Sequence, residues 1–341
     1  MAHLLFAAHF PGPANMLKPV MPLARRSGHR LTTVACGAAA EIWRRAGEDV
    51  CDVDERPFEA LAPDLLITGT GFDNFDRDLW RVAAGCNVGS LAVIDAWTNL
   101  NQRFVNDDGS EIQPDAICAI DRSMSDQIAD EGWCGARIHI TGQPHFQSVV
   151  ERLKEKRKAY RPSSVPLLVF FSEPVNTDFV SDTDRGFDQF SVAGSLLTAL
   201  AGFAPLSLVV QPHPRENRDD WQAWIGGRTL PQGIDIRIGE DTTETLLTTC
   251  DGAIGMTTMV LFEAALLGVP VLSLQPDRVS ALNPRLDVIE GLELVTESAA
   301  LPTAVGHFMR TLHTPRGIDP GLFHVIEDAN RRLLSAIESE L

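Results

Sequence analysis

Short apolar runs alternate along the chain with longer amphipathic or alanine-rich stretches. This rhythm is typical of βαβ units, in which buried parallel strands alternate with covering helices. In the first half it predicts strands at Leu4–Ala8, Arg30–Val34, Leu65–Thr68, Ser90–Ile94, Ala116–Ala119 and Arg137–Ile140, and helices at Met16–Arg26, Ala38–Ala46 and Arg122–Glu131. In the second half it predicts strands at Leu167–Phe171, Leu206–Val210, Ile234–Ile238, Gly252–Ile254 and Val269–Leu274, and helices at Gln189–Ala201, Thr243–Thr249, Thr258–Leu267, Ala300–Leu312 and Phe323–Glu338. The chain is therefore expected to be an α/β protein.

The rhythm breaks near residue 150, where a strongly charged segment is followed by a stretch rich in proline and serine. Such a stretch without periodicity is typical of an interdomain linker. We expect a first domain at 1–155, a linker at 156–166, a second domain at 167–325 and a C-terminal helix at 326–341 that packs back on the first domain. Because apolar strand segments alternate with helical segments in both halves, we expect two Rossmann-like domains whose parallel sheets face a central cleft.

Composition narrows the class of protein. Of the 341 residues, 44% are apolar and 22% are charged, which is ordinary for a globular chain and argues against disorder. The formal net charge of −17 excludes a protein that coats nucleic acid, because its surface would repel a phosphate backbone. A small nucleotide ligand remains compatible, since local amides and one or two cations can hold it.

Other features indicate a cytoplasmic protein. The segment Met1–Leu17 lacks a basic start and its apolar run is short, so a buried strand fits it better than a signal peptide. No apolar run approaches the roughly 18 residues of a membrane span. The six cysteines form no C-x-x-C pair and the nine histidines show no metal-ligand spacing. We therefore expect reduced core cysteines, no transmembrane segment, no metal and no cofactor; the oligomeric state stays open.

The most specific motif is the segment from Asp251 to Val271, which reads as a strand, a glycine turn, two hydroxyls and a helix that ends in glycine. A glycine at position 255 allows a ligand to approach the backbone. Thr257 or Thr258 can cap the helix, whose first N–H groups suit a phosphate. Glu263 is expected to face a ribose. The alternative is an ordinary capped helix.

A second motif ends the strand Leu208–Gln211 with the sequence Pro-His-Pro-Arg. Residues just past the carboxyl end of a parallel strand line the ligand crevice of an open α/β sheet. His213 and Arg215 can therefore donate to a phosphate, Arg215 through a bidentate fork. A loop histidine without function is the alternative.

These two motifs resemble the second domain of nucleotide-sugar glycosyltransferases of the two-Rossmann-domain (GT-B) architecture, in particular the bacterial sialyltransferase-like and capsule-type enzymes. The resemblance implies that His213 and Pro214 match a His-Pro motif, and that Thr257 and Thr258 match a Ser/Thr pair. With the residues of the two motifs and of the loop after Leu167–Phe171, where Ser172 as a plain turn residue is the alternative, the predicted nucleotide-binding set is His213, Pro214, Arg215, Gly255, Met256, Thr257, Thr258, Glu263, Ser172 and Glu173. The UDP-N-acetylglucosamine 2-epimerases share the spacing from Gly255 to Glu263.

Polar residues after the strands of the first domain are candidates for the sugar or acceptor side. Asp95 follows the fourth strand and is the leading general base, with His9 in reserve. Asp95 as a helix N-cap is the alternative. The remaining candidates for sugar or acceptor contacts are Gly12, Asn15, Trp97, Asn99, Arg103 and Gln143. The loop after the first strand lacks G-x-G-x-x-G, which disfavours NAD.

Three functions follow. The favoured one is a metal-independent inverting glycosyltransferase of surface glycan biosynthesis. It would move a CMP-linked nonulosonate (sialic-like) sugar, or next a UDP-sugar, to a hydroxyl of a glycan, peptide or small-molecule acceptor. The string Asp107-Asp108-Gly109 resembles the acidic motif of sialyltransferases but lies in a polar loop, which leaves the base uncertain. The second is a nucleotide-sugar 2-epimerase or hydrolase, disfavoured because the sequence shows no cluster of carboxylates. The third is a non-catalytic nucleotide-sugar-binding subunit.

Overall fold

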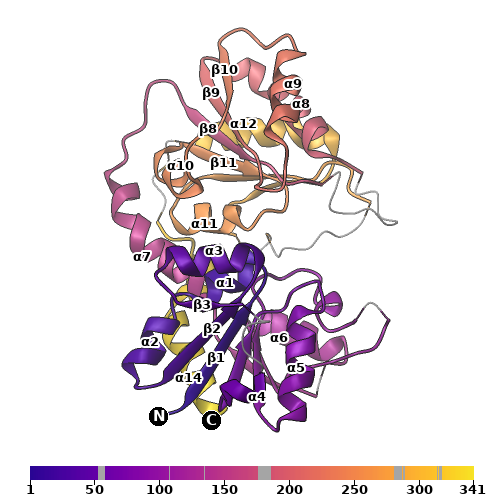
Figure 1. The fold of residues 1–341 in the computed structure, drawn as a ribbon. Coiled ribbons are helices and arrows are strands. Elements are labelled where there is room, and N and C mark those ends of the chain that lie inside the picture. Colours follow the sequence, from indigo (N-terminus) through magenta and orange to yellow (C-terminus); the bar gives the residue numbers. More distant parts are fainter. Residues whose placement is uncertain are drawn as a thin grey trace. The chain divides into compact units, whose positions relative to one another are not determined.

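The structure, a computed structural model, divides into two units, each with its own sheet (Figure 1). It describes residues 1–52, 58–106, 108–133, 135–175, 186–279, 286, 289–312, 314 and 317–341. Unit 1 comprises Met1–Ser148 together with His324–Leu341, and unit 2 comprises Val149–Phe323.

Unit 1 is built on a seven-stranded parallel sheet in the order β3-β2-β1-β4-β5-β6-β7. Its strands are β1 (His3–Ala8), β2 (Arg30–Ala35), β3 (Val50–Cys51), β4 (Leu65–Thr68), β5 (Gly89–Val93), β6 (Ala116–Ala119) and β7 (Arg137–Ile140). Strand β1 pairs with β2 on one side and β4 on the other, and all of its residues are buried. Burial on both faces explains why this strand is a continuous apolar run.

The helices of unit 1 complete this core, and the last of them comes from the end of the chain. They are α1 (Pro11–Leu17), α2 (Met21–Arg26), α3 (Gly37–Arg45), α4 (Phe58–Leu61), α5 (Phe75–Gly85), the 3₁₀ helix η2 (Asn101–Arg103), α6 (Arg122–Asp130) and α14 (Ala329–Ser339). Leu333, Ala336 and Ile337 of α14 join the same hydrophobic cluster as Leu4 and Phe6 of β1. Unit 1 is therefore completed by residues more than 300 positions from its first strand.

Unit 2 repeats the architecture with a six-stranded parallel sheet in the order β10-β9-β8-β11-β12-β13. Its strands are β8 (Leu167–Phe171), β9 (Leu206–Gln211), β10 (Ile234–Ile238), β11 (Gly252–Gly255), β12 (Val271–Leu274) and β13 (Glu293–Val295). Its helical segments are α8 (Gln189–Leu200), η3 (Ala201–Phe203), α9 (Arg218–Gly226), α10 (Thr243–Thr249), α11 (Val260–Leu266), η5 (Ser298–Ala300), α12 (Leu301–Thr311) and η6 (Pro320–Leu322). The helices α7 (Pro144–Ala159) and α13 (Phe323–Ile326) each span a boundary between the units.

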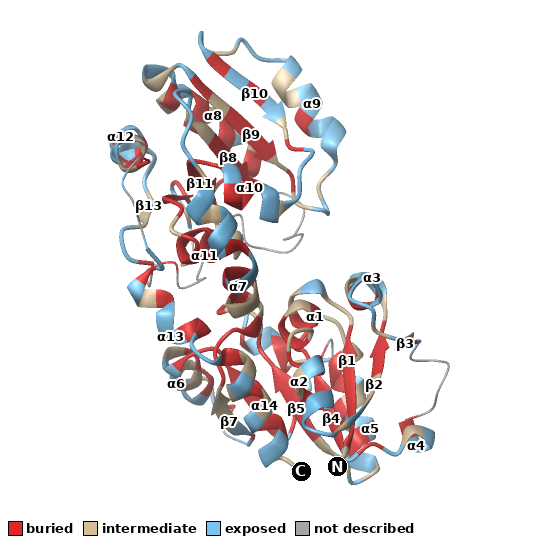
Figure 2. Cartoon of the chain, turned by 90° about the vertical axis from the view of Figure 1, so that its left-hand side faces the viewer, coloured by how far each residue is buried: buried red, intermediate tan, exposed pale blue. Residues whose placement is uncertain are grey.

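Both units confirm the predicted fold class of parallel-sheet, Rossmann-like α/β domains. Figure 2 shows the buried residues concentrated on the strands, where the apolar runs of the sequence lie. In each sheet the strand order reverses once, between β1 and β4 in unit 1 and between β8 and β11 in unit 2. In open α/β sheets, ligands bind at such a switch point, outside the carboxyl ends of the strands.

Some element predictions were wrong in detail. The single helix expected at Met16–Arg26 is two helices, because Pro19 interrupts it and cannot donate an N–H to a continuing helix. The expected linker at 156–166 is helical through Ala159, as the end of α7. The sequence analysis missed β3 and β13, which are two and three residues long and too short to carry a period.

Within the described part of the chain, every helix is too short or too polar to span a lipid bilayer.

Candidate functional site

At the carboxyl edge of the unit 2 sheet, the loops after β8 and β11 meet across the switch point. Glu173, after β8, accepts hydrogen bonds from the N–H and the hydroxyl of Thr257, at 2.6 and 2.8 Å. Thr257 follows β11, which pairs directly with β8. A carboxylate therefore occupies two donors of the turn in which the sequence predicts a phosphate site.

The loop after β9 is held at the same edge by Glu216. One oxygen of Glu216 accepts from the Ser172 hydroxyl at 2.8 Å and from the Trp221 indole at 3.2 Å. The other oxygen accepts from the His213 N–H at 2.6 Å. Ser172 and Glu173 are consecutive, so one dipeptide connects the His-Pro loop and the Thr-Thr turn.

The geometry of His213 defines which ring nitrogen can donate. The N–H of Arg215 donates to Nδ1 of His213 at 3.2 Å. In the neutral ring, Nδ1 is then the acceptor and Nε2 carries the proton. His213 is half-buried, whereas Pro214 and Arg215 are exposed. The loop therefore carries an imidazole whose Nε2 can donate and, two residues later, an exposed arginine.

The turn after β11 differs from the prediction in its details. Helix α11 begins at Val260, two residues later than expected, and the Thr258 hydroxyl accepts from the Val260 N–H at 3.3 Å. A Cβ on Gly255 would lie 2.8 Å from the Thr258 methyl and 3.3 Å from the Phe171 carbonyl oxygen. Packing within the protein therefore already requires a glycine here, and the approach of a ligand to Gly255 stays a prediction.

Two other predicted nucleotide contacts are buried. The Met256 side chain belongs to the hydrophobic core of unit 2. Its carbonyl accepts from the Ser273 hydroxyl at 2.6 Å and from the Gln275 amide at 3.1 Å. Glu263 lies on α11 and is also buried. The contact of Glu263 with a ribose stays a prediction, for a carboxylate that is buried in this structure.

The switch point of unit 1 carries a pocket of about 220 Å³. The pocket lies at the carboxyl ends of β1, β4 and β5, and it is lined by Phe10, Pro11, Gly12, Pro13, Thr70, Gly71, Phe72, Asp95, Ala96, Thr98 and Arg103. Three of the predicted residues, Gly12, Asp95 and Arg103, therefore line one cavity. Its small size suits one ring or one part of a larger ligand.

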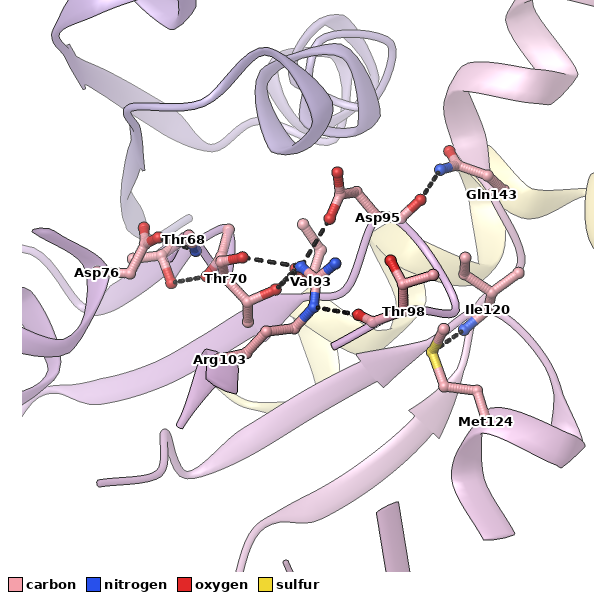
Figure 3. A network of polar contacts seen from close by, with 12 residues as sticks. Thr68, Thr70, Asp76, Val93, Asp95, Thr98, Arg103, Ile120, Met124 and Gln143 are labelled. Carbon is pink, nitrogen blue, oxygen red and sulfur yellow. Dashed lines mark hydrogen bonds and ion pairs between the residues drawn. The ribbon is translucent and has the colours of Figure 1, made fainter. Parts of the chain in front are cut away.

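Arg103 holds the wall of this pocket together (Figure 3). Its Nη1 donates to Oδ1 of Asp95 and to both oxygens of Thr70, each at 2.8 Å, and its Nε donates to the Thr98 carbonyl at 3.2 Å. The Arg103 side chain is 3% exposed and that of Asp95 is 20% exposed. Arg103 is thus a buried cation that joins the loops after β4 and β5, while Asp95 still reaches the pocket.

The approach of Asp95 to helix α1 depends on a glycine. A Cβ on Gly12 would lie 1.7 Å from Oδ2 of Asp95, so any other residue would displace the carboxylate. Gln143 fixes Asp95 from the opposite side, because its amide donates to the Asp95 carbonyl at 2.8 Å (Figure 3). Gln143 is buried and its side-chain oxygen accepts from the His145 N–H at 3.0 Å. Gln143 therefore positions the loop that carries Asp95.

Sequence reasoning missed two carboxylates that the fold places beside His9. Asp73, in the loop after β4, forms a short hydrogen bond to Nδ1 of His9, and both side chains are partly exposed. Asp76, at the start of α5, accepts from the Gly71 N–H at 2.6 Å. Burial raises the pKa of Asp76 to about 7. Both follow a predicted strand, Leu65–Thr68, and the rule that singled out Asp95 would have found Asp73.

Three other predicted sugar contacts are not among the residues that line this pocket. Trp97 is buried, and its indole donates to Asp121 at 2.8 Å, so it cannot stack on a sugar as predicted. Asn99 is exposed with a φ of 55°, a left-handed conformation that asparagine tolerates in turns. Asn15 is half-buried on α1 and accepts from Lys18 at 3.3 Å.

The acidic string at 107–109 forms no part of this pocket. Asp107 lies outside the described residues. Asp108 is exposed and accepts from the N–H and hydroxyl of Ser110, and Gly109 has a φ of 78°. These features are those of a turn. Among the described residues, no group of three or more His, Cys, Asp or Glu side chains is arranged to hold a metal ion.

Solved structures resemble the whole chain. No protein-family model and no curated protein matches the sequence. The UDP-GlcNAc 2-epimerase of Methanocaldococcus jannaschii matches with a TM-score of 0.69 at 12% identity, covering 99% of each chain. That of Neisseria meningitidis, solved with UDP-GlcNAc bound, matches with a TM-score of 0.70 at 11% identity, covering 99% of this chain and 100% of that one. At these identities the similarity establishes a shared fold.

The comparison corrects the favoured function. The calicheamicin glycosyltransferase CalG4 matches with a TM-score of 0.52 at 14% identity, covering 98% of this chain and 95% of that one. The 2-epimerases give clearly higher scores over a similar length. Glycosyl transfer as the first choice was therefore wrong, and the alternative, a nucleotide-sugar 2-epimerase, agrees better. The general GT-B-like fold holds, but the comparisons do not extend to its sialyltransferase-like branch.

Proposed function

We propose that this protein is a UDP-sugar 2-epimerase, either hydrolysing or non-hydrolysing, which acts on the sugar of its substrate without a hydroxyl acceptor. The observation that carries the proposal is a set of ionisable side chains that follow the neighbouring strands β1, β4 and β5 at the switch point of unit 1: His9 pairs with Asp73, Asp76 follows in the same segment, and Asp95 lines the pocket. The sequence analysis disfavoured an epimerase because it saw no such cluster. The fold creates the cluster by placing the loops after β1, β4 and β5 side by side.

The chemistry of epimerisation explains why several such groups are needed. Inverting C2 of a sugar requires a base that removes the C2 proton and an acid that returns one to the other face. Because C2 has no neighbouring carbonyl, the electron pair of the broken C2–H bond must expel UDP from C1 and form a C1–C2 double bond. UDP adds back to C1 when C2 is reprotonated, or water adds there and the free sugar is released together with UDP. A glycosyltransferase needs a base for its acceptor but no group that returns a proton to carbon. We assign the acid–base roles to Asp95 and His9. Asp73 orients the imidazole of His9, and Asp76 positions the loop at Gly71.

We assign the nucleotide to the switch point of unit 2. The N–H and hydroxyl of Thr257 are suited to an anion, because they already bind the carboxylate of Glu173. The imidazole of His213 and the guanidinium of Arg215 add donors at the neighbouring loop. In this proposal a diphosphate takes the place of Glu173 at Thr257, and these side chains neutralise its charge without a metal ion or a cofactor. UDP is favoured over CMP because the matching epimerases are named for UDP-GlcNAc.

The test is incubation of the full chain with UDP-GlcNAc in deuterated water without any acceptor, followed by NMR spectroscopy. We expect deuterium at C2, together with the 2-epimer or with free sugar and UDP. Asp95→Asn and His9→Gln should each slow this reaction by about 10²-fold or more. The control Asp108→Asn alters an exposed turn of unit 1 and should retain activity within about twofold.

Two results would count against the proposal. Absence of both UDP binding and turnover would remove the nucleotide-sugar assignment altogether. Binding of UDP-GlcNAc without exchange at C2 would instead indicate a non-catalytic binding protein.

A further inference from the structure

A second pocket of unit 1 lies away from the switch point, along the free edge of the sheet. Its volume is about 610 Å³. It is formed by α6, β7 and α14, and it is lined by Arg122, Ser125, Ile138, His139, Ile140, Thr141, Asp328, Arg331, Arg332, Ser335, Ala336 and Ser339. Strand β7 is last in the strand order, three places from β4 at the switch point. None of the residues assigned to the proposed reaction lines this pocket.

The charge of the pocket is opposite to that of the chain. The protein has 46 acidic and 29 basic side chains, yet three arginines and a histidine line this pocket against one aspartate, Asp328. His139 is already bound to Glu340 at 2.8 Å. Arg122 and Arg331 form no ion pair or hydrogen bond to any other described side chain. Two unpaired guanidiniums facing one cavity repel each other, and a bound anion would remove that repulsion.

Arg332 provides a further donor that lacks a partner. Its Nη2 donates to the His324 carbonyl at 2.7 Å, while its Nε is buried and has no hydrogen-bond partner in the described structure. Burial also lowers the pKa of this guanidinium. A Cβ on Gly142 would lie 2.6 Å from Nη2, so the glycine makes room for the guanidinium. The fold thus keeps a cation partly buried where a nearby anion would stabilise it.

The edge of β7 contributes backbone donors. The N–H groups of Arg137 and Thr141 donate toward β6, to Asp115 and Ala119 at 2.9 Å each. Because donors alternate along a strand, the N–H groups of Ile138 and Ile140 point to the free edge, which the pocket follows. Helix α14 places Arg332, Ser335 and Ser339 on the face toward the pocket, at helical spacing. Residues with guanidinium groups, residues with hydroxyl groups and the edge of β7 therefore line one cavity.

From these contacts we propose that the pocket between α6, β7 and α14 binds a small phosphorylated molecule. Its phosphate would lie between Arg122, Arg331 and Arg332, because the guanidinium fork matches phosphate oxygens. The apolar walls at Ile138, Ile140 and Ala336 leave room for an organic part, since the volume falls in the range of organic-ligand sites. This site goes beyond the proposed reaction and does not depend on it.

The test is hydrogen exchange on the full chain with glucose 1-phosphate, inorganic phosphate or glucose as the probe. We expect glucose 1-phosphate to protect the peptides covering 137–141 and 329–339, and glucose to have no effect. Protection by glucose 1-phosphate alone identifies an organic phosphate as the ligand, and equal protection by inorganic phosphate identifies the anion alone. Peptides at 211–217 and 255–259 report separately on UDP binding to unit 2.

Paired variants complete the test. Arg122→Ala with Arg331→Ala removes two exposed side chains and should weaken glucose 1-phosphate binding, measured by calorimetry, by about tenfold or more. The matched control Arg26→Ala with Arg44→Ala removes the same charge from exposed positions of unit 1 outside the pocket and should bind within about twofold of wild type. The proposal is overturned if neither phosphate protects these peptides at millimolar concentration, or if both double variants lose affinity equally.

Discussion

At the scale of single residues, buried or half-buried charged side chains of this chain join loops that follow different strands. Arg103 connects the loops after β4 and β5, Glu216 connects those after β8 and β9, and Glu173 connects those after β8 and β11. Each charge is costly to desolvate, and several charge-assisted hydrogen bonds offset that cost. The loops at both switch points are therefore held in place by the same kind of group that a polar ligand recognises.

Asp76 should make the stability of the protein depend on pH. Burial raises its pKa from 3.8 to about 7, so the folded state keeps a proton that the unfolded state releases above about pH 4. The contribution of protonated Asp76 to the free energy of unfolding is fully present below about pH 4, and it is lost as the pH rises through about 7. Asp76→Asn cannot ionise, and at about pH 8 it should raise the free energy of unfolding over wild type by up to about 4 kcal/mol.

Urea unfolding of both proteins between about pH 4 and 8 measures this difference, with Asp108→Asn as the exposed control. If wild type and Asp76→Asn show parallel pH profiles, the carboxyl of Asp76 is not buried in the way the structure shows.

At the scale of elements, helix α14 shows how one unit is built from both ends of the chain. Its inward-facing residues pack against β1. Its other face lines the pocket between α6, β7 and α14, the arginine-rich pocket. The amphipathic pattern of the segment predicts a helix, and packing against the first domain was an expectation made from sequence. Only the strand order of the folded sheet shows that β7 is a free edge beside α14. The four residues of β7 do not by themselves distinguish an edge strand from a central one.

Leu333→Ala should destabilise unit 1 through α14. Leu333 is fully buried, and truncating such a side chain leaves a cavity that costs about 2–5 kcal/mol. Its neighbour Leu334 is only partly buried, so Leu334→Ala should cost less than half as much. Hydrogen exchange should speed up in β1 and α14 of the first variant and stay unchanged in β8 and β9. Equal effects of the two variants would show that α14 does not pack as described.

At the scale of the whole molecule, the net charge of −17 is spread over 46 acidic and 29 basic side chains. Like charges on one chain repel each other, which favours expanded states over compact ones. The same excess disfavours binding along a phosphate backbone, whereas a small anion needs only a local group of donors. The acidic surface and the arginine-rich pocket are thus separate features of one molecule.

Raising the salt concentration should therefore stabilise the protein. Between about 20 and 200 mM sodium chloride the Debye length falls to below about 10 Å, and repulsion between distant carboxylates is screened. We expect the melting temperature to rise by a few degrees, measured by circular dichroism in a non-phosphate buffer. A fall in melting temperature would indicate that specific ion pairs outweigh the general repulsion.

Parallel strands buried on both faces are continuous apolar runs, and for that reason the fold class and most strands could be read from the residue pattern alone. The position of His213, Thr257 and Asp95 at the carboxyl ends of strands could be predicted in the same way, and their roles stay predictions. Three-dimensional packing decided the rest. Strand order brings Asp73 and Asp76 to His9, Trp97 is buried, and the Thr258 methyl lies where a Cβ of residue 255 would be. The physical reason is that contacts between distant segments decide which residues are buried and which lie next to each other. The local period of the sequence does not encode these contacts.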